Sequence, residues 1–192
     1  RWNGIVESYC LFASHIFTSN INVNVNHNVE YVGNVSKNRR ILNFEQQKIF
    51  LNEFSKISKI FNYPNQFKIT TSWFTKTLST DSVRPFHNHR NSFYSGIYYF
   101  DNYSSNTASI EFQSPIKQLN DFYIAPTKYH LQNSPFFNIK PSKNLLLFFP
   151  SYLEHTILNH NDTQPRYSLS FNIVPIGQYG EGDSTYNTSW MT

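Results

Sequence analysis

The sequence has little of the material from which cross-links, charged tails and membrane spans are made. It contains one cysteine, Cys10, which excludes an internal disulfide and a cysteine-rich zinc site. Only 15% of its 192 residues are charged and 18% are aromatic, the reverse of a disordered charged tail. No stretch of 18 apolar residues occurs, and residues 1–12 lack the pattern of a signal peptide. We therefore expect a cytoplasmic protein without membrane association, in the host-cell cytoplasm if it is viral.

Charge of either sign is also sparse. Sixteen basic and twelve acidic residues give a net charge of +4, and the basic residues are scattered, with Arg39 and Arg40 as the only adjacent pair. This pattern indicates a solvated surface rather than a nucleic-acid footprint, so nucleic acid is not an expected partner. The abundance of Asn, Ile, Phe, Tyr and Lys is typical of AT-rich coding, as in some phages and bacteria.

The length suits one domain over residues 1–192. We expect irregular and helical support over 1–66, a β core over 67–175 and a C-terminal loop tail over 176–192. Alternation of apolar residues with Asn over 21–25 predicts a half-buried edge strand. Asn43 followed by Gln46 is typical of a helix start, and the helix is expected to end at residues 62–65. Its apolar face would consist of Phe50, Phe54, Ile57 and Phe61.

After this helix the chain has the character of strands. Each segment is rich in β-branched and aromatic residues and is bounded by Pro, Asn, Ser or Asp. The segments are 67–80, 92–101, 108–112, 121–125, 144–149, 155–158 and 166–174. Several strands at short spacing behind one helix predict a mainly β barrel or sandwich.

Three of the seven histidines could meet at one metal ion. His87 and His89 are separated by one residue, and such residues point to the same side of a strand. His155 follows the apolar run 145–150 and a short turn, and it would supply a third ligand from a distant strand. An HxH pair alone is more often two surface or hydrogen-bonded histidines. The other four, His15, His27, His130 and His160, are interpreted as structural.

Arg166 opens an apolar strand eleven residues after His155. A guanidinium that points into a barrel needs an anion, because a buried unpaired charge is costly. One solution is a ligand carboxylate held by two hydrogen bonds, with Ser168 on the same strand face as a hydroxyl donor. The alternative is an internal ion pair with Glu111 or Glu154.

Two groups of segments resemble the two halves of a known enzyme core. The first group is Ser72-Trp73, 84–89 (RPFHNH) and 95–99 (SGIYY), and the second is 146–151 (LLFFPS), His155 and 166–172 (RYSLSFN). Together they resemble 2-oxoglutarate/Fe(II)-dependent oxygenases, and more narrowly a group from phages and bacteria with unassigned substrates. The resemblance is good over about 70–175 and looser over 8–70.

This resemblance implies a mainly β fold, a double-stranded β-helix (a jelly-roll or cupin-like barrel) with an N-terminal supporting helix. It implies Fe(II) as cofactor, 2-oxoglutarate as cosubstrate, and dioxygen with a second substrate as partners. The implied reaction is hydroxylation of a protein or peptide side chain or a small metabolite. Residues 113–143 and the C-terminal tail are expected to be substrate-side loops, because variable loops around a rigid barrel usually set specificity.

Carried over residue by residue, the resemblance puts His87 and His155 at metal-ligand positions. It puts Arg166, with Ser168 beside it, at the site of the distal carboxylate of 2-oxoglutarate. Tyr99 resembles the tyrosine that also reaches this carboxylate. Since Tyr98 and Tyr99 point to opposite faces of a strand, at most one of them faces the site.

One residue departs from the usual pattern of the superfamily. His89 stands where most members have Asp or Glu, and a neutral imidazole does not lower the charge of an Fe(II) centre. Three-histidine iron sites exist in other dioxygenases, so we interpret His87, His89 and His155 as the metal ligands and catalytic set. Alternatively His89 faces away, or a remote acid such as Asp101 or Glu111 supplies the third ligand. Imidazoles also suit Zn, Ni and Cu.

Two rival functions stay open from the sequence. One is a three-histidine, cupin-like dioxygenase that needs no 2-oxoglutarate, and the other is a non-catalytic β-barrel binding module. The nucleic-acid demethylase branch of the superfamily carries a second Arg six residues after the first. Asn172 occupies that position here, which weakens a nucleic-acid substrate. A homodimer is compatible with the sequence.

Overall fold

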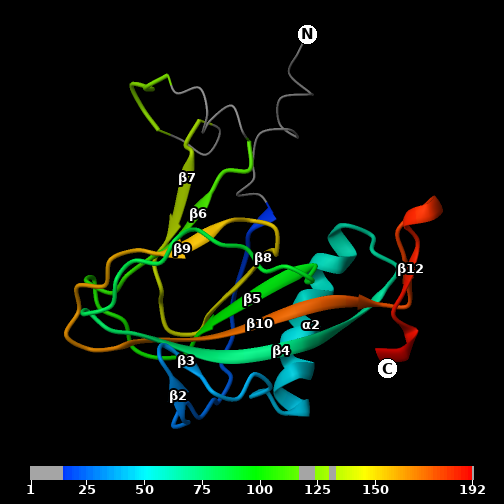
Figure 1. Cartoon of the computed structure of the whole chain (residues 1–192), viewed down its shortest axis with the longest axis horizontal. Coiled ribbons are helices and arrows are strands. Elements are labelled where there is room, and N and C mark those ends of the chain that lie inside the picture. The colour runs from blue at the N-terminus through cyan, green and yellow to red at the C-terminus, as the bar shows by residue number, and fades with distance from the viewer. Residues whose placement is uncertain (1–14, 117–123, 130–132, 192) are drawn as a thin grey trace.

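The computed structural model describes residues 15–116, 124–129 and 133–191, and its centre is a pair of facing antiparallel sheets (Figure 1). The larger sheet has the order β1-β8-β5-β10-β4-β3-β2, and the smaller has the order β7-β6-β9. The strands of the larger sheet are Phe17–Asn20 (β1), Tyr31–Val32 (β2), Val35–Ser36 (β3), Gln66–Thr77 (β4), Tyr94–Tyr99 (β5), Leu145–Pro150 (β8) and Arg166–Ile176 (β10). Those of the smaller sheet are Ile110–Gln113 (β6), Phe136–Ile139 (β7) and His155–Ile157 (β9).

The chain passes repeatedly from one sheet to the other. Residue 87 lies between β4 and β5 in sequence and pairs with His155, which extends the smaller sheet by one bridge. From β4 onward the path crosses to this bridge, back to β5, over to β6 and β7, back to β8, over to β9 and back to β10. This interleaving of two antiparallel sheets is the double-stranded β-helix, as predicted.

Helix α2 (Phe44–Ile60) covers the outer face of the larger sheet (Figure 1). Its start is the predicted capping box: the Asn43 side chain accepts from the Gln46 backbone at 2.9 Å, and the Gln46 side chain accepts from the Asn43 backbone at 3.1 Å. Phe50 and Phe54 are fully buried, in ring contact with residues of β5, β8 and β10. The helix therefore fixes the position of the strands that carry the site.

The central strands divide their residues between two apolar clusters. On β5, Tyr94 and Tyr98 point outward to the cluster under α2, whereas Ile97 and Tyr99 point into the space between the sheets. Strand β8 alternates in the same way. On β10 the outward residues are apolar, and the inward residues are polar: Arg166, Ser168, Ser170 and Asn172. Strand β10 thus gives a hydrophobic face to the core and a polar face to the barrel interior.

The N-terminal prediction was wrong in one place. Residues 21–25 alternate in burial but form no strand, whereas β1 lies just before them. The reason is that the Val23 backbone N–H donates to the Tyr98 hydroxyl at 2.9 Å rather than to a neighbouring strand. Within the predicted loop 113–143 the structure adds strand β7, which pairs with β6. Cys10, His130 and most of the predicted strand 121–125 lie outside the described residues.

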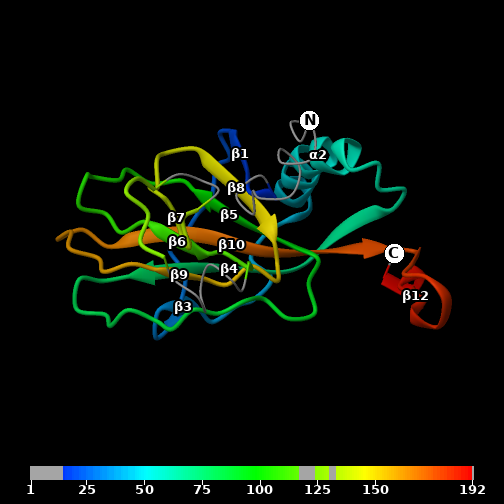
Figure 2. The same cartoon turned by 90° about the horizontal axis from the view of Figure 1, so that it is seen from above.

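The C-terminal tail continues β10 to Ile176 and then forms a small hairpin, β11 (Gln178–Tyr179) with β12 (Tyr186–Asn187). Two short 3-10 helices, Gly182–Ser184 and Ser189–Met191, accompany it. The Asn65 side chain donates to the carbonyls of Ile176 and Gln178, at 3.1 and 2.9 Å. In both views the hairpin lies at the end of the molecule remote from β9 (Figures 1 and 2). No helix in the described part of the chain is long and apolar enough to cross a membrane.

Gly96 is required by a close approach between two central strands. A Cβ atom built at this position would overlap the ring of Phe171, its register partner on β10. We expect Gly96→Ala to lower the free energy of unfolding by about 1–3 kcal/mol, the usual effect of overpacking a core. The cost should shrink in a Phe171→Leu background, which chemical denaturation of the four proteins of the cycle would measure. An equal cost in both backgrounds would contradict this explanation.

Candidate active site

Three histidines from two separate parts of the chain converge at one mouth of the barrel. One ring nitrogen from each of His87, His89 and His155 lies within 4.8 Å of those of the other two. Their ring centroids are 4.5 Å apart for His87 and His155, 5.0 Å for His89 and His155, and 5.7 Å for His87 and His89. In the described part of the chain, neither Asp101 nor Glu111 belongs to this cluster.

Backbone pairing holds the three imidazoles in register. The His87 N–H donates to the His155 carbonyl at 3.1 Å, and the His155 N–H donates to the His87 carbonyl at 2.9 Å. The His89 N–H donates to the carbonyl of Ser151 at 3.0 Å, next to the end of β8. Because β8 and β9 are joined by a short turn, this pairing places both ends of the HxH segment against one corner of the barrel.

The Nδ1 atom of each histidine faces an acceptor. The His155 Nδ1 lies 3.0 Å from the Leu153 carbonyl, and the His87 Nδ1 lies 3.4 Å from the Pro85 carbonyl. The His89 Nδ1 lies 2.8 Å from the side-chain oxygen of Asn172. A proton on Nδ1 satisfies each of these oxygens and leaves the lone pair on Nε2 for a metal ion.

Burial keeps two of these rings neutral. It lowers the pKa of His155 to about 3, and it lowers the pKa of His89 against the opposing effect of the hydrogen bond to Asn172. His155 is 3% exposed, whereas His87 lies at the exposed side of the cluster. Three imidazoles within reach of one another, with one side open to solvent, are a donor set that fits a divalent transition-metal ion with free coordination positions.

Arg166 is buried at the inner face of β10, with 1% of its surface exposed. Its Nε donates to the Ala108 carbonyl at 3.0 Å and its Nη2 to the Tyr99 hydroxyl at 2.8 Å, and its Nη1 lies 3.4 Å from the Ser168 hydroxyl. The ion pairs between described residues are Lys37–Glu30 and Lys56–Glu53, both away from this site. Neither Glu111 nor Glu154 pairs with Arg166, and its hydrogen-bond partners among the described residues are neutral.

The two tyrosines of β5 have separate surroundings. Tyr99 is fully buried beside Arg166, whose guanidinium lies 5.1 Å from the ring centroid. Burial raises the pKa of Tyr99 although Arg166 opposes this, so the phenol keeps its proton and can donate it. Tyr98 points to the other side of the sheet, where its hydroxyl accepts from Val23.

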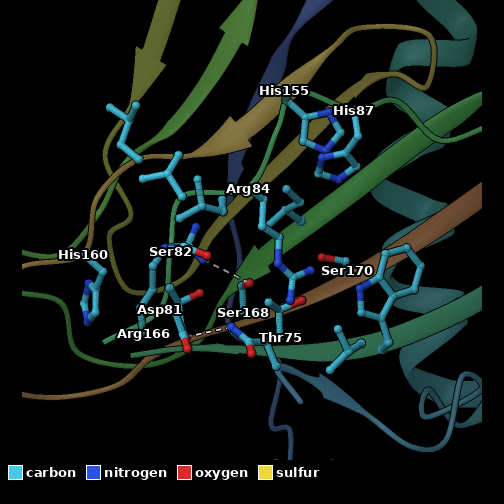
Figure 3. A pocket seen from close by; sticks show the side chains of 18 of the residues that line it. Thr75, Asp81, Ser82, Arg84, His87, His155, His160, Arg166, Ser168 and Ser170 are labelled. Carbon is cyan, nitrogen blue, oxygen red and sulfur yellow. Dashed lines mark hydrogen bonds between the residues drawn. The ribbon is translucent and has the colours of Figure 1, made fainter. Parts of the chain in front are cut away.

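A single pocket joins the histidines to Arg166 (Figure 3). Between them it is lined by Ser168 and Ser170 from β10 and by Thr75 from β4. Ile97 and Ile157 add apolar wall, and the loop after β4 contributes Asp81 and Arg84. Figure 3 shows the Arg84 side chain reaching into this pocket. In the described part of the chain, neither residues 113–143 nor the tail lines this pocket, and their role as substrate-side loops stays a prediction.

Several residues without a predicted function also lie at the site. Ser95, Ser151 and Asn172 surround the Nδ1 side of His89. Asp81 and Arg84 line the pocket, and their position a few residues before the HxH pair was the available signal.

His160, interpreted as structural, supports Arg166 from behind. It is buried, and its Nδ1 accepts from the Ala108 N–H at 3.3 Å while its Nε2 donates to the Gln164 carbonyl at 2.8 Å. Because the carbonyl of the same residue accepts from Arg166, His160 and Arg166 bind the two peptide groups that flank the Ala108 Cα.

Comparisons with known proteins agree with this geometry. A family model described as "Putative 2OG-Fe(II) oxygenase" matches residues 71–172. No curated protein matches the sequence. Among solved structures, AviO1 from Streptomyces viridochromogenes Tue57 is similar with a TM-score of 0.51 and 11% identity, over 81% of this chain and 72% of that one.

Two further structures resemble the chain more distantly. An oxidoreductase of the 2OG-Fe(II) oxygenase family from Burkholderia pseudomallei has a TM-score of 0.47 and 13% identity, over 83% of this chain and 68% of its own. A prolyl-4-hydroxylase from Pseudomonas putida has a TM-score of 0.42 and 13% identity, over 65% of this chain and 60% of its own. At such identities the structural likeness concerns the fold.

The family match is the decisive comparison. Residues 71–172 make up just over half of the chain and include the HxH pair, His155, Arg166 and Asn172. The family uses Fe(II) and 2-oxoglutarate, and its enzymes act with dioxygen on a second substrate. The chain therefore belongs to the 2-oxoglutarate/Fe(II)-dependent oxygenase family.

Proposed function

We propose that the chain is a hydroxylase in which His87, His89 and His155 hold Fe(II) and Arg166 receives the distal carboxylate of 2-oxoglutarate. The observation that carries this proposal is that one pocket contains both the three histidines and the buried Arg166. Three imidazoles converge at one end, and a buried guanidinium with only neutral partners lies at the other. A cosubstrate with a carboxylate at each end suits a pocket with a cation at one end and a metal site at the other.

The chemistry of oxidation comes from the bound group, and the protein supplies its placement. Fe(II) with 2-oxoglutarate, when bound, supplies the oxidising power that converts a substrate C–H bond to C–OH. The three imidazoles would bind the ion from one side and leave its other positions accessible from the exposed side of His87. Phe112 and Phe149 pack against the ring of His155, with centroids 5.8 and 4.9 Å away, and exclude water from its protein side.

Arg166, Tyr99 and Ser168 would act together on the distal carboxylate. The guanidinium supplies the charge, and the hydroxyls of Tyr99 and Ser168 are already in contact with it. Each hydroxyl can turn its proton toward an incoming oxygen, because both accept from Arg166. The cosubstrate would thereby be held in one orientation along the inner face of β10.

A peptide side chain or a small metabolite is the substrate class that we infer. The metal-binding cluster opens to solvent at His87, and the nearby wall is the loop with Asp81 and Arg84, so both charges would face an incoming substrate. Asn172, at the position of the second Arg of the demethylase branch, is engaged with His89 and Thr71. Its amide is therefore committed within the protein rather than offered to a phosphate.

Removal of His155 should abolish tight metal binding. It is the most buried of the three histidines and is fixed by both backbone pairing and the Leu153 carbonyl, so it is held most firmly in place. We expect His155→Ala to weaken Fe(II) binding by more than about 100-fold, since loss of outer contacts alone costs 10- to 100-fold. Anaerobic calorimetric titration measures this change. His27→Ala, a histidine packed among aromatic rings elsewhere, is the matched control, and equal metal affinity in the two variants would contradict the assignment.

Arg166 should decide whether 2-oxoglutarate binds. Addition of 2-oxoglutarate to the anaerobic Fe(II) protein is expected to produce a visible charge-transfer band. We expect Arg166→Ala to weaken 2-oxoglutarate binding about 30-fold or more, because truncation of one partner of a buried charge pair costs about 2–5 kcal/mol. Arg166→Lys should be intermediate, because an ammonium keeps the charge but loses the planar fork. Arg39→Ala, an exposed arginine outside the pocket, is the control.

The same titration separates the rival functions. Metal binding without any effect of 2-oxoglutarate on the spectrum would favour a three-histidine dioxygenase that needs no cosubstrate. Absence of binding of both the metal and 2-oxoglutarate would favour a non-catalytic β-barrel module. A band that is unchanged in Arg166→Ala would refute the proposed role of this residue.

A further inference from the structure

We propose that Asn172 is a positioning residue that makes His89 the third metal ligand, with the hydroxyl of Ser95 as its helper. This inference rests on the proposed function, because it concerns the same metal centre. It assigns a role to Ser95 of the SGIYY segment and to Asn172 of the RYSLSFN segment. Neither residue has a role in the oxygenase function proposed above.

The contacts behind His89 are short and come from two paired strands. The His89 Nδ1 lies 2.8 Å from the Asn172 Oδ1 and 2.8 Å from the Ser95 Oγ. Asn172 on β10 and Ser95 on β5 are register partners, so the two oxygens are presented side by side. The Nδ1 of His89 is thus held by two oxygens, and one ring nitrogen of His89 lies within 4.8 Å of a ring nitrogen of His87 and of His155.

The orientation of the Asn172 amide is set by a third strand. Its Nδ2 donates to the hydroxyl of Thr71 on β4 at 3.0 Å, so the Oδ1 faces His89. A carboxamide oxygen can only accept, which requires a proton on the His89 Nδ1. The Nε2 then carries the lone pair that a metal ion needs.

A chain of serine hydroxyls fixes the remaining partner. The Ser92 hydroxyl donates to the Tyr94 carbonyl at 2.9 Å, and the Ser151 hydroxyl donates to Ser92 at 3.0 Å. The Ser95 hydroxyl donates to the Asn172 Oδ1 at 3.1 Å, and its Oγ also lies 2.8 Å from the Ser151 Oγ, so Ser95 links Asn172 to the serine chain. In the part of the chain that the structure describes, no buried side-chain polar atom lacks a hydrogen-bond partner, so every buried polar atom of this network is satisfied.

The identity of the third ligand explains why such support is required. A carboxylate ligand would attract a cation by its charge, whereas a neutral imidazole depends on the correct tautomer and ring orientation. A hydrogen-bond acceptor behind the ring supplies both and raises the basicity of the ligand nitrogen. Asn172 therefore does for His89 what the Leu153 carbonyl does for His155.

The test measures Co(II) and anaerobic Fe(II) binding by titration calorimetry. We expect Asn172→Leu and the milder Asn172→Ala to raise the Kd about 10- to 100-fold, the usual effect of losing an outer-shell partner. Asn172→Asp should bind within about threefold of wild type or more tightly, because a carboxylate is an acceptor at the same place. Asn65→Leu is the matched control. The Asn65 side chain also makes two hydrogen bonds, to the carbonyls of Ile176 and Gln178, but it lies outside the pocket.

A double-mutant cycle separates positioning from a general structural effect. If Asn172 acts through His89, then Asn172→Leu should change metal affinity little in a His89→Ala background. A second readout needs no metal. Nitrogen NMR of histidine-labelled, metal-free protein should show the Nδ1–H tautomer for His89 in the wild type and a mixture in Asn172→Leu.

Each outcome has a separate meaning. Equal Kd values for wild type and Asn172→Leu, or an equal loss in the His89→Ala background, would overturn the role of Asn172 and leave the metal centre intact. An unchanged tautomer in Asn172→Leu would overturn it as well. A wild-type protein that binds neither Co(II) nor Fe(II) would overturn the proposed metal centre and the role of Asn172 together.

Discussion

The buried positive charge of Arg166 is the constraint on which the rest of the site depends. A guanidinium that is 1% exposed has lost its hydration, and its partners are a carbonyl and two hydroxyls. Neutral acceptors satisfy the N–H groups but leave the charge uncompensated. Strand β10 is anchored by the core under α2, and in the function that we propose the distal carboxylate of 2-oxoglutarate would compensate the charge. The charge of Arg166 is therefore explained by the binding of an anion, as proposed, rather than by a contribution to the stability of the fold.

Strand β10 joins this charge to the metal end of the pocket. Its outer face is apolar and packs under α2, where Phe171 contacts Phe50 at 4.9 Å between ring centroids. Its inner face begins with Arg166 and ends with Asn172 behind His89. Because one rigid strand carries both residues, the packing of the helix sets the spacing between the anion site and the histidines. Core packing and chemistry are coupled through the two faces of one element.

Local patterns in the sequence were sufficient for the helix and for the alternation of the central strands. His155 was expected beside the HxH pair from its position after the apolar run 145–150 and from the resemblance to the oxygenases. The capping residues Asn43 and Gln46 act within one turn, so nothing distant could override them. Residues 21–25 were mispredicted because Val23 bonds to Tyr98, which lies 75 residues away. The hydrogen bond between His89 and Asn172 could not be predicted for the same reason, since Asn172 is 83 residues further along the chain. Periodicity predicts which face a residue occupies, but it does not predict which distant side chain meets it there.

With His89 as the third metal ligand, as we propose, the charge of the pocket would differ from that of a site with an acidic ligand. A divalent ion on three imidazoles keeps its charge of +2, and Arg166 adds another positive charge in the same low-dielectric space. A dianionic cosubstrate would then neutralise most of the site, whereas with a carboxylate ligand it would meet one fixed negative charge. A three-histidine set would thus bind the metal with less help from charge, and it would attract the dianionic cosubstrate more strongly. Retention of the metal then depends on how firmly each imidazole is oriented, which is why the hydrogen bonds behind the rings matter as much as the ligands.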